Sequence, residues 1–232
     1  MSSKALLDLV GGIDEVRALR THFPVPSRGL PTGDKALAVK AHGRACVVLL
    51  TSHLERYIYA VNEEAIEWVN SSSCDLSRFP EVFLLQHSQR AVDELAARNW
   101  ENRAAPLREF VSMYGALWTP PGRAGTLKHG ETLTWMKSPA PENLERYYRM
   151  YGIKNIFHQI TRKPGPRSLL YLGLRELVEK RNNIAHGDAA TQALPADVTR
   201  YLSAVGKFAD SADKALARSL RSLVGAGATA PW

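Results

Sequence analysis

Arg181 and His186 are the residues of this chain whose types and spacing best suit chemistry. Arginine carries a cation that does not deprotonate in proteins, and its planar fork of N–H groups suits a phosphate. Histidine titrates near neutral pH and can take or give a proton. Five residues of helix separate two Cα atoms by roughly 8–9 Å, so both side chains can reach one small ligand. Asn182 lies beside Arg181 and adds a neutral hydrogen-bonding group.

This pair has the minimal chemistry for cleaving RNA without a metal ion. His186 suits the removal of the 2′-hydroxyl proton, and Arg181 suits the charge on the scissile phosphate. One chain supplies a single imidazole here, whereas acid–base cleavage also needs a proton donor. The other histidines and the two cysteines show no His-x-x-x-His or Cys-x-x-Cys spacing, so we expect no metal site and no cofactor.

The stretch from Ser168 to Asp188 must position these residues, and it has the pattern of one amphipathic helix, called the motif helix below. Ser168 is the expected N-cap and Gly187 the expected C-terminal cap. Four apolar residues recur with helical period and predict a face in the core: Leu170, Leu174, Leu177 and Ile184. Arg181 falls within that face, where a guanidinium needs a partner or a wet cleft.

The sequence RNNIAHGD, residues 181–188, resembles the R-x(4–6)-H signature of the HEPN superfamily (higher eukaryotes and prokaryotes nucleotide-binding domains). In that signature an Asn, Asp or His typically follows the arginine, and Asn182 fits. A second stretch, GRACVVLLTSHLERYIYAVNEEAIEWV at residues 43–69, is similar to the long early helix of the RiboL-PSP subfamily of HEPN proteins. The two resemblances extend in patches from about residue 35 to about residue 190.

The resemblance implies an all-α bundle and, as in many HEPN members, a metal-independent endoribonuclease that acts as a toxin or defence-system effector. It implies that Arg181, Asn182 and His186 are catalytic and that two motifs face each other across the cleft of a homodimer. RNA is then the expected partner, together with an antitoxin or another defence-system protein. Other HEPN members bind a nucleotide or support a partner enzyme, so the alternative is a non-catalytic module that binds a nucleotide or a partner protein.

Both motif residues also have a purely structural interpretation. Arg181 could form a buried ion pair with an acid of the early helix, such as Glu55 or Glu63. His186 could cap the C-terminal end of its helix, where the helix dipole favours an imidazolium. A structural bundle without a site is therefore a third hypothesis.

The composition favours a polyanionic partner. The formal net charge is +7, which suits RNA, DNA or an anionic lipid surface. With 45% hydrophobic and 23% charged residues, the chain has the composition of an ordinary globular protein. No apolar run approaches the ~18 residues of a membrane span, and the first residues lack the pattern of a secretion signal. We therefore expect a cytoplasmic protein that does not bind a membrane. Cys46 and Cys74 are expected to be free thiols.

Basic residues next to the motif extend the expected RNA surface. The turn TRKPGPR brings Arg162, Lys163 and Arg167 to the start of the motif helix, and Lys180 stands directly before Arg181. Residues 119–141 hold four prolines and three glycines and predict a long surface loop. Its basic and aromatic residues suit RNA contacts, and a disordered insertion is the alternative.

The rest of the chain is helical in pattern and shows no strand signal. We expect a single all-α domain over residues 1–232, a bundle of about six to seven helices with the motif helix in its core. Residues 224–232 are expected to form a flexible tail.

Overall fold

The computed structural model describes residues 2–22, 32–72, 74–119, 127–225 and 230–232. Over these residues the elements are nine α-helices and two short 3-10 turns, which confirms the predicted all-α class. The count exceeds the six to seven predicted because α5 (His129–Thr132) and α7 (Ile156–Ile160) are too short to show a helical period in the sequence.

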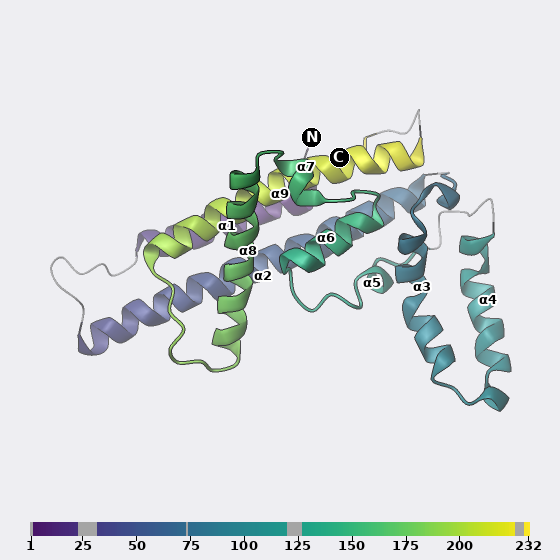
Figure 1. Ribbon diagram of the computed structural model, residues 1–232, viewed down its shortest axis with the longest axis horizontal. Helices are drawn as coiled ribbons and strands as arrows, with labels where there is room; N and C mark the ends of the chain where they lie inside the picture. The colour runs from purple at the N-terminus through teal and green to yellow at the C-terminus, as the bar shows by residue number, and fades with distance from the viewer. Residues whose placement is uncertain (1, 23–31, 73, 120–126, 226–229) are drawn as a thin grey trace.

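Three long helices form the frame of the molecule (Figure 1). α1 (Lys4–Thr21), α2 (Gly33–Ser71) and α9 (Pro195–Val224) pack on one another. Apolar residues at helical spacing form the buried face of α2: Val47, Leu50, Leu54, Tyr57, Val61 and Ala65. Trp68 at its end is partly buried. None of these frame helices, nor any other helix in the described ranges, is long and apolar enough to cross a membrane.

The motif helix α8 (Pro164–Ala185) lies across α2 and α9 and contacts both (Figure 1). Gly173 permits the close approach to α9, because a Cβ built there would lie 3.1 Å from the Cβ of Ala204. Beside α8, α6 (Pro141–Met150) and α7 complete the core. The hydroxyl of Tyr151, which follows α6, donates to Asn62 of α2 at 2.9 Å, so this buried phenol is satisfied.

A helical hairpin projects from this body on the side away from α8 (Figure 1). It consists of α3 (Glu81–Ala96), the 3-10 turn η2 (Trp100–Asn102) and α4 (Ala104–Trp118). α3 packs on α5 and α6, whereas α4 packs mainly on α3, on η2 and on the 3-10 turn η1 (Leu76–Arg78). Only Tyr114 and Leu117 of α4 are buried.

The predicted surface loop at 119–141 is wrong for the part that the structure describes. Leu127, Leu133 and Met136 are buried in the core. Two asparagines of α2 satisfy the backbone there: Asn70 pairs with both the carbonyl and the N–H of Leu127, and Asn62 donates to the carbonyl of His129. Residues 120–126 lie outside the described residues.

The predicted flexible tail is also wrong at its end. Trp232 is half-buried against the core, and its indole N–H donates to the Oδ2 atom of Asp213 at 2.9 Å. Asp213 is a buried carboxylate of α9 that also accepts from Ser3, the N-cap of α1. Residues 226–229 lie outside the described residues.

Candidate active site

The motif helix begins earlier than its sequence predicts. Its N-cap is Lys163 and its first residue is Pro164, four residues before the expected cap Ser168, so that expectation is wrong. Proline is tolerated in the first turn because the N–H it lacks would have no partner within the helix. Arg167 therefore lies within the first turn of α8, and Arg162 directly precedes the N-cap.

The end of the helix is as predicted. Gly187 has a φ of 82°, in the left-handed region where glycine is favoured. Its N–H donates to the carbonyl of Ile184, and the N–H of Asp188 donates to the carbonyl of Asn183 at 2.9 Å, which together form a Schellman cap. The carbonyl of Asp188 also accepts from the guanidinium of Arg44 on α2 at 3.0 Å.

The carboxylate of Asp188 fixes the next turn of the chain. It accepts hydrogen bonds from the hydroxyl of Thr191 and from the N–H of Ala190, and these bonds hold the pKa of Asp188 below its usual range. The segment that follows His186 is thus held by two contacts of Asp188. Arg44 of α2 binds the carbonyl of Asp188, and the carboxylate of Asp188 closes the turn.

The buried face of the helix confirms the predicted stripe. Leu170, Leu174 and Leu177 are buried, and Ile184 is half-buried against the core. Full burial of a leucine side chain stabilises a fold by about 1.5–3 kcal/mol, so this face anchors α8 between α2 and α9.

Arg181 lies on this face and is held by two residues. Its Nη2 atom lies 2.7 Å from Oε2 of Glu55 on α2, and its Nη1 atom donates to Oδ1 of Asn182 at 3.1 Å. The side chains of Arg181 and Glu55 remain 23% and 27% exposed. The ion pair foreseen for Arg181 is thus present, with Glu55, while Glu63 faces His129 instead at 3.6 Å. Because a guanidinium has five N–H donors, others remain for a ligand.

His186 is the C-cap residue of α8, and its side chain is exposed. Its backbone N–H donates to the carbonyl of Asn182 at 2.9 Å, so the capping interpretation holds for its backbone. Among the described residues, its ring forms no hydrogen bond or ion pair. The structure therefore joins Arg181 to Asn182 directly and places His186 about one turn further on, with an imidazole that is open to a ligand.

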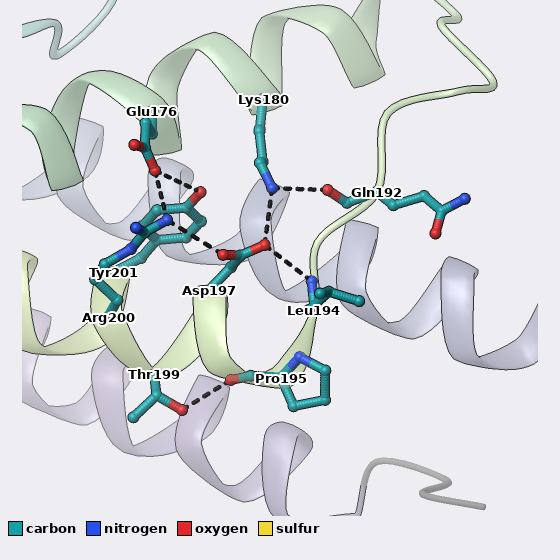
Figure 2. Close-up of polar contacts among 9 residues, drawn as sticks. All are labelled: Glu176, Lys180, Gln192, Leu194, Pro195, Asp197, Thr199, Arg200 and Tyr201. Carbon is teal, nitrogen blue, oxygen red and sulfur yellow. Dashed lines mark hydrogen bonds and ion pairs between the residues drawn. The ribbon is translucent and has the colours of Figure 1, made fainter. Parts of the chain in front are cut away.

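Lys180 has a structural partner (Figure 2). Its ammonium donates to Oδ2 of Asp197 on α9 at 2.9 Å and to the carbonyl of Gln192 at 2.8 Å. Burial opposes the charge of both groups, yet their hydrogen bond and attraction outweigh it: the pKa of Lys180 is raised and that of Asp197 is lowered. Arg200 extends this network by pairing with Glu176 of α8. Lys180 thus ties α8 to α9.

No family model, no curated protein and no solved structure matches this chain. The likeness to HEPN proteins consequently rests on residues 43–69 and 181–188, and the catalytic roles stay predictions. In the described ranges, no three His, Cys, Asp or Glu side chains gather as a metal site would require.

Basic side chains concentrate around the start of α8. Residues 146–175 contain seven arginines and lysines and no aspartate or glutamate. Arg162 and Lys163 are exposed, and Arg167 is half-buried. None of these three side chains forms an ion pair with another described residue. An anion that approaches this end of α8 therefore meets cations that are not engaged in ion pairs with described residues, although Glu145 lies in the same cavity lining as Arg167.

Arg167 lines a cavity of about 320 Å³, at the low end of the range for small-ligand sites. The other lining residues mix aromatic and polar groups: Glu145, Asn155, Phe157, Ser168, Tyr171 and Leu172. The hydroxyl of Tyr171 donates to Glu142 at 2.7 Å, and burial together with this bond raises the pKa of Tyr171 to about 12. Arg167 precedes Arg181 by fourteen residues, so about 21 Å of helix separates this cavity from the motif.

In addition to the residues predicted to be catalytic, two residues near the motif belong to the candidate site. The sequence indicates Glu55 only as one of two possible structural partners, because several acids lie on the early helix. Arg44, which holds the carbonyl of Asp188, had no signal in the sequence, since the two residues are 144 positions apart. Both come from α2, so this helix forms one wall of the candidate site.

Proposed function

We propose that this protein is a metal-independent endoribonuclease in which Arg181, Asn182 and His186 form the catalytic site. One observation carries the proposal: an exposed imidazole without a partner in the described chain follows a guanidinium that is held in place from two sides. A positioned guanidinium and an unpartnered imidazole are groups that transesterification of RNA can use.

Each residue has one task in this proposal. His186 takes the proton of the 2′-hydroxyl, and the 2′-oxygen then attacks the neighbouring phosphorus. Arg181 donates to the phosphate oxygens as negative charge accumulates on them, and Asn182 keeps the guanidinium in position. The bond from phosphorus to the 5′-oxygen breaks, and that oxygen gains a proton. The products are a 2′,3′-cyclic phosphate and a 5′-hydroxyl.

A second copy of the chain would supply the missing proton donor. Each chain has one histidine at the motif, and in a homodimer two motifs could share a cleft, with one imidazole as base and the other as acid. The exposure of His186 at the end of α8 is compatible with such a contact. The toxin or defence role, its partner protein and a cytoplasmic location belong to this proposal as well.

The cations at the other end of α8 would bind the RNA strand. Arg162, Lys163 and Arg167 have no carboxylate partner among the described residues, and the cavity beside Arg167 has the aromatic wall of Phe157 and Tyr171. Phosphates on the arginines and a base against the aromatic wall is a common mode of single-strand binding. A strand that runs along α8 would then reach the motif after several nucleotides.

A specific observation also supports a second candidate, a non-catalytic module that binds a nucleotide or a partner protein. Glu55 neutralises Arg181 in the structure, so the motif has less attraction for a phosphate than a free guanidinium would have. In that case the cavity beside Arg167 would be the ligand site, and the motif would stabilise the packing of α8 on α2.

Product chemistry separates the two candidates. Purified protein is incubated with single-stranded RNA in the presence of EDTA, and the ends of any fragments are determined. The ribonuclease proposal expects fragments with a 2′,3′-cyclic phosphate and a 5′-hydroxyl. Intact RNA that is nevertheless bound, or fragments that carry a 5′-phosphate, would contradict it.

A further inference from the structure

The hairpin of α3, η2 and α4 carries an apolar groove near its tip. The groove has a volume of about 620 Å³ and is lined mainly by apolar side chains: Val92, Leu95, Ala96, Trp100, Ala104 and Leu107. Trp100 is 79% exposed although tryptophan is a strongly apolar residue. The guanidinium carbon of Arg103 lies 5.8 Å from the centroid of the Trp100 ring. Arg103 itself donates to the carbonyls of Ala96 and Arg98, so it holds the Trp100 ring in position before any partner binds.

The apolar surface continues along both helices beyond the groove. On α4, Leu107 and Val111 are one turn apart and are 47% and 58% exposed, and Trp118 follows on the same face. On α3, the exposed residues Leu85 and Val92 are seven positions apart and therefore share a face. A helix face with this pattern normally packs against another element, and exposed apolar patches of this kind mark interaction sites.

We propose that this hairpin surface binds a second copy of the same chain, hairpin against hairpin, as a four-helix bundle. Two antiparallel hairpins that share their apolar faces form a common bundle arrangement. Such a contact is isologous, which means that the same surface is used on both copies.

The charges of the hairpin support the hairpin of a second copy as its binding partner. Residues 81–118 contain four arginines and five acidic residues, a net charge of −1, in a chain with a formal net charge of +7. The remainder of the chain is therefore strongly positive, and two copies repel each other least where their hairpins meet. An isologous contact requires a surface that complements itself, and the interspersed arginines and carboxylates can pair across the two-fold axis. A partner of one charge sign would match only half of these groups.

The exposed apolar area is also of the right size. The exposed parts of Leu85, Val92, Trp100, Leu107, Val111 and Trp118 amount to on the order of 600 Å² per copy. Stable protein interfaces bury about 800 Å² on each partner, including a polar rim. The charged side chains beside the groove, among them Glu101 and Arg103, would supply such a rim.

This contact is separate from the composite active site proposed above. The hairpin projects on the side away from α8 (Figure 1), so a contact through it leaves His186 uncovered. If the motif helices also pair, the two interfaces together produce a tetramer or a longer assembly. The hairpin contact can therefore exist whether or not the protein cleaves RNA.

The test is the molar mass of the full chain in solution by light scattering between ~1 and ~100 µM. The wild type is expected at twice the chain mass of 25.7 kDa, or at a larger multiple. The double variant Trp100→Glu/Val111→Glu should fall to half the wild-type mass, with association weakened at least ~10-fold. The matched control Leu7→Glu changes a residue of α1 that is 61% exposed and should keep the wild-type mass.

Circular dichroism and thermal melting establish that each variant is folded. Trp100→Glu alone is the second variant, because Trp100 lies in the exposed turn η2 and contributes little to the core. A wild type that is monomeric over the whole concentration range would overturn the proposal. The proposal would also be overturned if only a different protein, and not a second copy of this chain, bound in the groove. A folded double variant that keeps the wild-type mass would overturn it too, because the assembly would then use another surface.

Discussion

Glu55 and Arg181 are 126 residues apart in the sequence, yet Oε2 of Glu55 lies 2.7 Å from Nη2 of Arg181. The pair joins the middle of α2 to the last turns of α8, where each side chain is only about a quarter exposed. Asn182 accepts from the other terminal nitrogen of Arg181. The guanidinium is thus oriented before any ligand arrives, and Glu55 both positions it and competes for it.

The first prediction concerns Glu55→Gln, which removes the charge and keeps the shape. Arg181 loses its counter-charge, so RNA should bind about 3- to 10-fold more tightly. The cleavage rate should nevertheless fall about 10-fold, because Asn182 and a neutral amide hold the guanidinium less firmly than Asn182 and a carboxylate. Binding is measured by fluorescence anisotropy and cleavage on the same RNA. Glu63→Gln, which changes a carboxylate that lies 3.6 Å from His129, is the control and should change neither quantity. Equal behaviour of the two variants would show that Glu55 has no role at a site.

The second prediction concerns the turn that ends the motif helix. Gly187→Ala forces an L-residue into a φ of 82° and should lower the free energy of unfolding by about 1 kcal/mol. It should also reduce cleavage more than this loss explains, because the turn sets the direction of His186. Gly165→Ala in the first turn of α8 meets no atom within 4 Å and should keep or slightly raise stability. Urea unfolding measures both, and a Gly187→Ala variant with full activity would show that the ring direction is unimportant.

The third prediction separates two cations that the sequence placed together in the RNA surface. Lys180→Met removes the bond to Asp197 and should destabilise the fold by about 1–2 kcal/mol with little effect on RNA affinity. Arg167→Met should weaken RNA binding and lower its salt dependence with little effect on stability, because Arg167 has no ion pair among the described residues. The opposite pattern in melting and binding experiments would reverse their assignment.

The fourth prediction follows from a buried histidine far from the motif. Burial, with a smaller contribution from Lys128, lowers the pKa of His87 to about 4, and its Nε2 atom accepts the N–H of Lys128. The unfolded chain takes up this proton near pH 6.5 and the folded chain only near pH 4, so the stability contributed above pH 6.5 is lost as the pH falls from 6.5 to 4. The loss is at most about 3 kcal/mol.

Thermal melting over that pH range tests this prediction. His87→Gln keeps an acceptor for Lys128 but cannot titrate, so its stability should fall less steeply than that of the wild type. His158→Gln changes an exposed residue of α7, so this variant is the control and should follow the wild type. Parallel curves for all three proteins would show that the pKa of His87 is the same in the folded and the unfolded state.

Local patterns predicted the parts of the fold that depend on neighbouring residues. The apolar period of α8 identified its buried leucines, and the glycine after the motif identified its left-handed cap. The start of α8 was misplaced because a helix can begin with proline at a position that also resembles a turn.

Contacts between distant segments could not be predicted in the same way. The asparagines of α2 that hold the backbone of residues 127–129, and the bond from Trp232 to Asp213, join positions with no common pattern. At the site, Arg181 pairs with Glu55 and not with Glu63 because of the way α8 crosses α2. The residue pattern of one helix does not specify how it crosses another. For the same reason the sequence places Lys180 in the RNA surface, although its ammonium binds Asp197 of α9 in the structure.

The measurement that tests the central claim most directly is the rate of RNA cleavage in EDTA by wild type, His186→Ala and His158→Ala. Both histidines are exposed, and both lie at helix positions with few packing contacts, so neither substitution should unfold the protein. If His186 is the base, His186→Ala should lower the rate at least ~100-fold while RNA affinity changes little, and His158→Ala should keep the wild-type rate. Cleavage by His186→Ala at the wild-type rate, or no cleavage by any of the three folded proteins, would contradict the account.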